Sequence, residues 1–189
     1  MSPSGTTLSR SRAAAPSYLF LENVRVVTPR AVLESGTVLV RGDTIEAVDA
    51  APGVTPEQAR RIDGDGGLLI PGMIDLHSDA LERFIEPRPG AVFPLPMAIT
   101  EFDRILVGSG ITTMYHCVAF SFPDSRARHL RTNEEAMRIV EELHRLRPML
   151  LGKTRIHARY DIVNREALPL IERLAREGRV DLVSFMDHT

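Results

Sequence analysis

Apolar and polar positions alternate in two different ways along this chain. Residues 18–67 contain short β-like runs separated by turn signals such as Gly42-Asp43, which predict a small antiparallel β unit. From residue 68 onward, strand-like runs alternate with segments in which apolar residues recur every three or four positions. This β-α-β-α-β-α-β order predicts a parallel sheet with helical crossovers, and therefore an α/β fold.

The second part divides into four expected strands and three expected helices. The strands are expected over residues 68–77, 110–118, 154–163 and 180–186. The first helix is expected near residues 95–107. The second begins at a capping box formed by Thr132 and Glu135, and the third has Pro169 in its first turn and ends at Gly178. Four strands are either a small open sheet or half of the eight that close a barrel of about 250 residues.

Composition narrows the classes of protein that the chain can represent. Residues 1–17 are almost entirely Ser, Pro, Gly, Thr, Arg and Ala, so we expect a disordered tail without a secretory signal. A net charge of −2 does not indicate a general nucleic-acid surface. No apolar run approaches the roughly 20 residues of a membrane helix. The single cysteine, Cys117, excludes an internal disulfide, and we expect a cytoplasmic location.

Polar residues that can perform chemistry gather at the carboxyl ends of the expected strands. They are Asp75, His77, Asp79, His116, Cys117, His157, Arg159, Asp161, Asp187 and His188. In barrels and open α/β sheets this end forms the active face. Spacing by two places Asp75, His77 and Asp79 on one strand face, with Ile74 and Leu76 toward the helices. Imidazole and carboxylate groups converging there could bind Zn²⁺ or Mn²⁺.

Structural roles explain some of these residues equally well. His116 could be a packed histidine bonded to a carbonyl group, and Asp187-His188 could form a simple turn. Arg159 could do no more than pair with Asp161 or Asp79. The arginine-rich segment around His129, which includes Arg131, is interpreted as a solvated surface.

Several motifs, in order, resemble the phosphonate-metabolism branch of the amidohydrolase superfamily. They read GGLLIPGMIDLHSDALE, HSDALERFIEPRPGAVFP, GITTMYHCVAFS, RIHARYDI and LVSFMDHT. The resemblance implies part of a small β-sandwich over residues 18–67, followed by the first half of a TIM-like (β/α)8 barrel over residues 68–189. It also implies a metal-dependent hydrolase that cleaves the 5-triphosphate of a ribosyl methylphosphonate and releases pyrophosphate.

The resemblance also assigns expected roles to individual residues. His77 and Asp79 match the metal position of the first barrel strand, and Asp161 stands where the family is expected to have a glutamate. Arg88 and Arg159 are candidates for contacts with substrate phosphates, because guanidinium groups bind phosphate in a fork geometry. Asp187 and His188 are candidate acid–base residues, although the family's acid–base residue and further metal ligands are expected in a missing C-terminal half.

Two other interpretations remain open, and the family interpretation leads to two further expectations. The chain could be an amidohydrolase acting on a cyclic amide or nucleobase, for which an apolar rather than a basic mouth is expected. It could also be a catalytically inactive half-barrel. Because the chain offers fewer ligands than the two-metal site of the family, we expect weak or absent metal binding by the isolated chain. Because half a barrel exposes strand edges, we also expect a need for a partner half or self-association.

Overall fold

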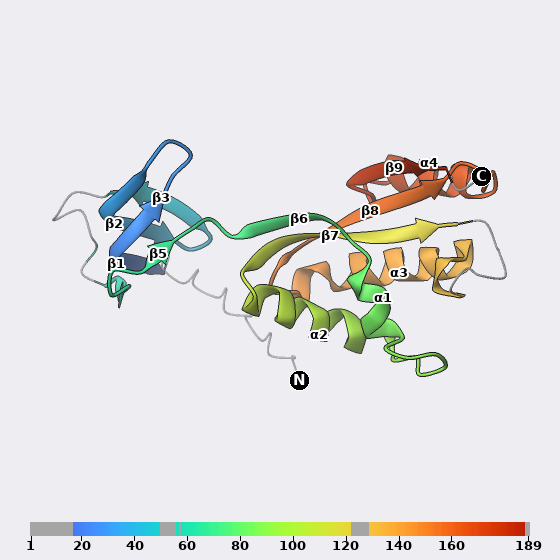
Figure 1. Cartoon of the computed structure of the whole chain (residues 1–189), viewed down its shortest axis with the longest axis horizontal. Coiled ribbons are helices and arrows are strands. Elements are labelled where there is room, and N and C mark those ends of the chain that lie inside the picture. Colours follow the sequence, from blue (N-terminus) through green and yellow to red (C-terminus); the bar gives the residue numbers. More distant parts are fainter. Residues whose placement is uncertain (1–16, 50–55, 57, 122–128, 188–189) are drawn as a thin grey trace, which may run out of the picture. The chain divides into compact units, whose positions relative to one another are not determined.

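The computed structural model describes residues 17–49, 56, 58–121 and 129–187 (Figure 1). The chain divides into two compact units, one reaching Pro71 and the other beginning at Gly72. Of the tail expected over residues 1–17, only Ser17 lies within the described residues. None of the helices in the described ranges is long and apolar enough to span a membrane.

The first unit is a single small sheet. Its strands are β1 (Tyr18–Val27), β2 (Val32–Arg41), β3 (Thr44–Val48), β4 (Arg60–Asp63) and β5 (Leu68–Leu69). Strands β1, β2 and β3 are antiparallel as predicted, but β4 and β5 pair with β1 in parallel. Val24, Val26 and Val38 form its small buried cluster.

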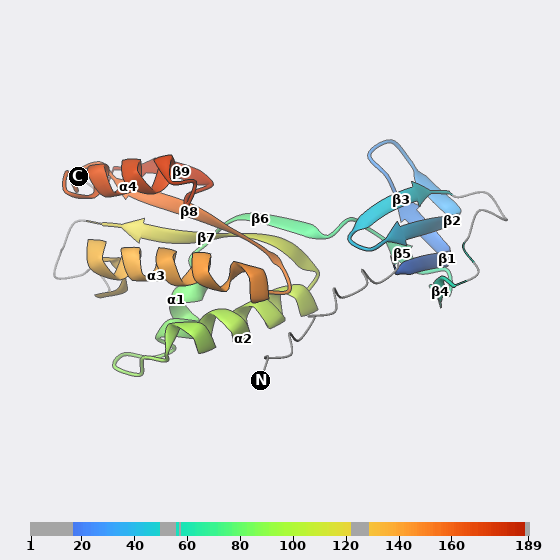
Figure 2. The same cartoon turned by 180° about the vertical axis from the view of Figure 1, so that it is seen from behind.

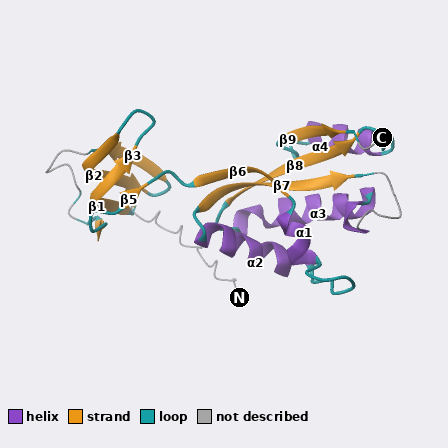
Figure 3. Cartoon of the chain, viewed as in Figure 1, coloured by secondary structure: helices purple, strands orange, loops and turns teal. Residues whose placement is uncertain are grey.

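The second unit is a parallel sheet with helical crossovers, coloured by secondary structure in Figure 3. Its strands run in the order β6 (Met73–Ser78), β7 (Ile111–Phe120), β8 (Lys153–Asp161) and β9 (Leu182–Met186). Its helices are α1 (Ala80–Ile85), α2 (Leu95–Gly108), α3 (Asn133–Leu146) and α4 (Ala167–Arg176), with short 3-10 turns η1 (His129–Arg131) and η2 (Arg147–Met149). The predicted alternation of strands and helices is confirmed, and the curled sheet is part of a barrel.

One face of this sheet packs on the helices, as seen from both sides in Figures 1 and 2. A continuous buried cluster joins residues of α1, α2, α3 and α4 to those of β7 and β8. Ile156, Ala158 and Tyr160 of β8 belong to this cluster. Because side chains alternate along a strand, His157 and Arg159 lie on the opposite face, which faces the interior in a barrel.

The beginning of the second unit differs from the expected single strand over residues 68–77. Leu68 and Leu69 pair with β1 in the first unit, so the strand of the second unit starts only at Met73. Ile74 and Leu76, expected to meet the helices, are 63% and 56% exposed. Their exposure follows from the position of β6 at the sheet edge, where its register with β7 is irregular.

Carboxylates hold the amino-terminal side of the sheet together. Asp103 of α2, only 5% exposed, accepts hydrogen bonds from the backbone N–H groups of Leu151 (2.7 Å) and Gly152 (3.0 Å). Asp181, just before β9, binds two guanidinium groups and one backbone N–H group. These contacts fix the starts of β8 and β9, so the carboxyl ends of the strands have a rigid base.

Gly72 occupies a position where the described structure leaves no room for a side chain. A Cβ added there would lie 2.1 Å from Oγ1 and 2.7 Å from Cβ of Thr112. Relief requires a backbone shift, so we expect Gly72→Ala to lower the free energy of unfolding by about 1–3 kcal/mol. The measurement is the urea midpoint at unchanged slope.

The matched control for this substitution is Gly108→Ala. A Cβ at Gly108 meets no described atom within 4 Å outside its own helix backbone. Alanine there should be neutral or stabilise by about 0.4–1 kcal/mol. Equal losses in the two variants would contradict the steric explanation.

Candidate functional site

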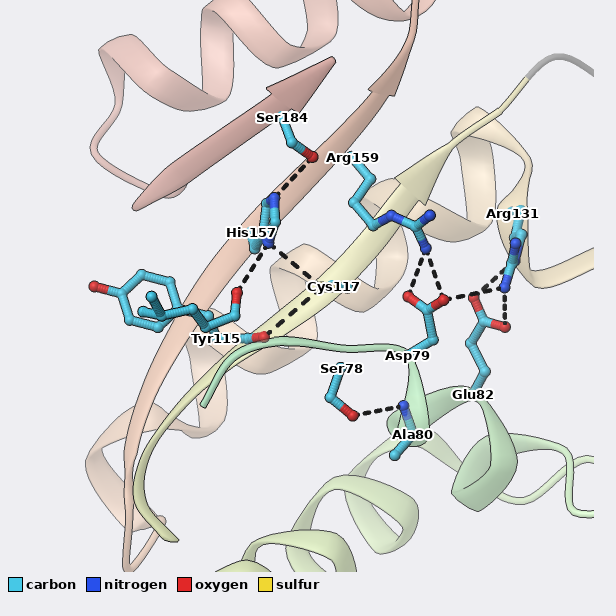
Figure 4. A network of polar contacts seen from close by, with 11 residues as sticks. Ser78, Asp79, Ala80, Glu82, Tyr115, Cys117, Arg131, His157, Arg159 and Ser184 are labelled. Carbon is cyan, nitrogen blue, oxygen red and sulfur yellow. Dashed lines mark hydrogen bonds and ion pairs between the residues drawn. The ribbon is translucent and has the colours of Figure 1, made fainter. Parts of the chain in front are cut away.

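A network of polar side chains lies at the carboxyl ends of β6, β7 and β8 (Figure 4). At its centre, Nη1 of Arg159 on β8 donates to both carboxylate oxygens of Asp79, at 2.6 and 2.7 Å. Asp79 is the residue before α1, with φ and ψ of −88° and 8° that are not those of an extended strand, and β6 ends at Ser78. The strand periodicity that grouped Asp79 with Asp75 and His77 therefore ends before it. The pairing of Arg159 with Asp79, one of two possibilities in the sequence, is found.

A second arginine extends the network. Arg131, in η1 after β7, forms a two-point contact with Glu82 of α1: Nε donates to Oε1 at 2.9 Å and Nη2 donates to Oε2 at 3.0 Å. Nη2 of Arg131 also lies 3.6 Å from Oδ2 of Asp79. We call the carboxyl-terminal end of β6, β7 and β8 the mouth of the site. The two carboxylates and two guanidinium groups make the mouth strongly polar, but their charges sum to zero.

Beside this network, His77, Cys117 and His157 bring three metal-capable groups together. Their ligand atoms lie within 4.8 Å of one another. Cys117 and His157 are Cα partners in the ladder between β7 and β8, and Sγ lies 3.4 Å from Nδ1. The rings of His77 and His157 meet edge to face at 5.3 Å. On the other side of the His157 ring, Nε2 lies 2.8 Å from Oγ of Ser184 on β9.

Burial sets the protonation of two of these groups. Burial lowers the pKa of His157, and the nearby charges of His77 and Arg159 lower it further, so the imidazole is neutral at neutral pH. Burial raises the pKa of Cys117 to about 11, helped by the charge of Asp79. The described site therefore holds a neutral ring next to a protonated thiol.

His116 does not take part in this face, although it is adjacent to Cys117. Its ring is 2% exposed and meets the ring of Phe102 in α2 edge to face at 5.7 Å. His116 is thus packed on the helical side, as one of the two interpretations proposed, but its Nδ1 has no hydrogen-bond partner among the described residues.

The remaining candidate residues fall in different places. Asp161 ends β8, is 3% exposed, and lies by alternation on the same sheet face as His157 and Arg159. Asp187 is exposed directly after β9, and His188 lies outside the described residues. Arg88 is exposed in a turn between α1 and α2, where its carbonyl accepts from the N–H of Ala91 at 3.0 Å. Arg88 is not a member of the network around Asp79.

Sequence reasoning missed three residues of the site. Arg131 was assigned to a solvated surface, yet its side chain is 27% exposed and bound to Glu82. Glu82 lies in a six-residue helix too short to show a periodic pattern. Ser184 alternates with Val183 and Phe185 in the last strand, so that period of two was the available signal for it.

The divalent metal implied by an amidohydrolase resemblance fits the predicted ligands only in part. His77 offers an exposed imidazole, and the Asp161 carboxylate belongs to the same sheet face. Both oxygens of Asp79 are bound to Arg159, so this carboxylate is not free to hold a cation in the described arrangement. The set His77, Asp79 and Asp161 therefore stays a prediction, while the described residues place His77 with Cys117 and His157.

Comparison with known proteins gives one curated relative. No protein-family model matches the chain. The chain is 34% identical over 171 residues to alpha-D-ribose 1-methylphosphonate 5-triphosphate diphosphatase of Escherichia coli (strain K12). The match covers 90% of this chain and 44% of the relative, so the chain spans less than half the length of that protein. The resemblance inferred from the motifs is confirmed.

Solved structures share the fold of this chain. An N-acetyl-D-glucosamine-6-phosphate deacetylase from Mycobacterium smegmatis superposes with a TM-score of 0.53 and 21% identity, covering 89% of this chain and 43% of that one. The N-acetylglucosamine-6-phosphate deacetylase from Pasteurella multocida gives 0.52 and 21%, covering 75% of this chain and 34% of that one. At 21% identity these two matches show the fold alone, that of a partial barrel with a separate small sheet.

Proposed function

We propose that this relative of the E. coli diphosphatase forms part of a metal-dependent hydrolase that cleaves a phosphoric anhydride. The substrate class is a triphosphorylated ribosyl phosphonate, from which pyrophosphate leaves while a 5-phosphate remains on the sugar. The name of the relative and the amidohydrolase fold support this proposal. A divalent metal, when bound, supplies an acidified water and offsets charge on the phosphate oxygens.

The observation that carries the proposal is the state of Arg159. Its side chain is 14% exposed, and Nη1 donates a hydrogen bond to the carboxylate of Asp79. Its Nε is buried and has no hydrogen-bond partner among the described residues. A buried donor without a partner is costly, and an arginine has the planar fork that suits phosphate oxygens. We infer that a substrate phosphate supplies the acceptor that Nε lacks.

The ion pairs around Arg159 give the site a way to respond to substrate. A phosphate that accepts from Arg159 competes with Asp79 for the same guanidinium group. As Arg159 turns toward the phosphate, the carboxylate of Asp79 is released and becomes available to a cation beside His77. Arg131 stays bound to Glu82 through two hydrogen bonds and keeps the Asp79 end of the mouth in place. Asp161 is the proposed further ligand, and Asp187 a proposed acid–base group.

Titration with inorganic triphosphate tests the proposal on the 189-residue chain. We expect Arg159→Ala to weaken triphosphate binding at least tenfold, because the variant loses a charged donor in a partly buried site. The matched control is Arg138→Ala, whose guanidinium is exposed on α3 and pairs with Glu135 at 2.6 Å. Calorimetry gives the triphosphate affinity of both variants. The salt concentration is kept constant, because salt screens the attraction between arginine and phosphate charges and would change both affinities.

A second measurement separates this reaction from ring-opening chemistry. Ribose 1-methylphosphonate 5-triphosphate and a cyclic amide are offered to the chain with Zn²⁺ or Mn²⁺, and pyrophosphate and ring-opened product are quantified. The mouth formed by Asp79, Glu82, Arg131 and Arg159 is polar rather than apolar, which supports the phosphorylated substrate over the cyclic amide. Equal triphosphate affinity in Arg159→Ala and Arg138→Ala, or turnover of the amide alone, would overturn the proposal.

A further inference from the structure

We propose that His77, Cys117 and His157 form a binding site for a thiophilic divalent cation of the Zn²⁺ class. This set differs from the predicted set of His77, Asp79 and Asp161, with which it shares only His77. The inference does not depend on hydrolysis of any substrate, because it stands on the arrangement of three side chains.

The backbone places these side chains in position to share one ion. They come from three neighbouring strands, β6, β7 and β8, whose order in the sheet is fixed by their pairing. Cys117 and His157 are direct partners in a parallel ladder, so their side chains leave the same face side by side. All three ligand atoms already lie within 4.8 Å of one another.

One of the three ligand–ligand distances already matches tetrahedral zinc. Bonds of about 2.3 Å to sulfur and about 2.0–2.1 Å to nitrogen place tetrahedral ligand atoms about 3.3–3.6 Å apart. The distance of 3.4 Å between Sγ of Cys117 and Nδ1 of His157 falls in this range without any movement. His77 is exposed, so a change of its side-chain rotamer can bring its nitrogen inward.

The surroundings of His157 suit a metal ligand. Oγ of Ser184, 2.8 Å from Nε2, can accept a hydrogen bond from the Nε2–H group, which leaves Nδ1 as the free ligand atom. Metal-binding histidines usually donate their other ring N–H to such an acceptor, which fixes the tautomer and ring orientation. Without a metal, the other tautomer donates from Nδ1 to the carbonyl of Leu76 at 3.1 Å. Ion binding therefore exchanges one hydrogen bond for one coordinate bond at Nδ1.

Ligand chemistry selects the class of cation. Thiolate and imidazole together suit Zn²⁺ or Co²⁺, whereas Mn²⁺ and Mg²⁺ prefer carboxylate, carbonyl and water oxygens. As the metal–sulfur bond forms, the Cys117 thiol gives its proton to water, because the cation stabilises the thiolate. Exposure of His77 gives the ion a path from solvent and leaves water as the fourth ligand, so the site is open rather than closed.

Cobalt spectroscopy tests this site directly on the full chain kept reduced. Addition of Co²⁺ should produce a sulfur-to-cobalt charge-transfer band that saturates at one ion per chain and disappears when Zn²⁺ displaces the cobalt. Mn²⁺ in excess should not suppress the band. Cys117→Ser should abolish the band, and His157→Gln should weaken Co²⁺ binding at least tenfold.

Two further variants keep the result interpretable. Ser184→Ala removes only the partner of Nε2, so it should retain the band with several-fold weaker affinity, even where Cys117→Ser fails to fold. His144→Gln removes an exposed imidazole on α3 and should leave the band and its affinity unchanged. Absence of the band in the folded parent chain, its persistence in Cys117→Ser, or its loss in His144→Gln would overturn the proposal. Triphosphate binding through Arg159 is measured without added metal, so the two proposals can fail separately.

Discussion

Acidifying the metal-free protein from pH 7 to about pH 4 is expected to remove about 3 kcal/mol of stability through His116 alone. Burial, aided by the positive charge of Arg147, lowers the pKa of His116 from 6.5 to about 4. In the unfolded chain His116 therefore becomes protonated below pH 6.5, whereas in the folded chain it becomes protonated only near pH 4. The stabilising contribution is complete above pH 6.5 and is lost as pH falls toward 4.

Replacement of the ring isolates this effect. His116→Leu has no titratable group, and it also removes Nδ1, which has no hydrogen-bond partner among the described residues. Urea unfolding at pH 7 and pH 4.5, with a chelator present, should show a pH-dependent loss smaller by about 2–3 kcal/mol in the variant. His144→Gln, at an exposed position on α3, is the control. Parallel pH profiles of the parent and His116→Leu would refute the assignment.

Asp181→Asn is expected to lower the free energy of unfolding by about 3–4 kcal/mol at neutral pH. Oδ2 of Asp181 accepts from Nη2 of Arg147 at 2.6 Å and from the N–H of Ile156 at 2.8 Å, while Oδ1 accepts from Nη1 of Arg155 at 2.7 Å. The Asp181 side chain is only 14% exposed. An amide can accept only through its single oxygen, so the variant leaves two partly buried guanidinium groups without their counter-charge.

Acid also weakens the Asp181 contact, but for a different reason from His116: the charged form of Asp181, rather than the neutral form, is stabilised in the folded protein. Burial alone would raise the pKa of Asp181, but the Ile156 N–H and the guanidinium groups of Arg155 and Arg147 outweigh it and lower the pKa. The contribution is present above the unfolded value of 3.8 and is lost only as pH falls below it. Glu177→Gln, which breaks an exposed pair with Arg179, should cost less than about 1 kcal/mol. Similar urea midpoints for the two variants would contradict the buried role of Asp181.

The sequence predicted those parts of the fold in which local pattern and tertiary packing agree. Ile156, Ala158 and Tyr160 alternate with His157, Arg159 and Asp161, and the structure buries the first set against the helices. Thr132 accepts from the N–H of Glu135 at 3.3 Å, which confirms the expected start of α3. Glu135 itself binds Arg138 rather than completing a capping box.

Other features depend on contacts that no local pattern records. The contact between Glu82 and Arg131 joins residues 49 positions apart, and only the folded sheet brings them together. The sequence predicted that Leu68 and Leu69 begin a barrel strand, but in the structure they pair with β1 of the first unit. The grouping of His77 with Cys117 and His157 depends on the registers of β6, β7 and β8.

The order of strands in the second unit has a consequence for synthesis of the protein. Each of β7, β8 and β9 pairs with the strand that precedes it in the chain, so every new strand finds its neighbour already made. Ribosomes deliver about 5–20 residues per second, far more slowly than helices and short loops form. The sheet can therefore grow one strand at a time as the chain emerges. The first unit has the opposite timing, because β1 must wait for β4 and β5, about 40 residues later, before both of its edges are paired.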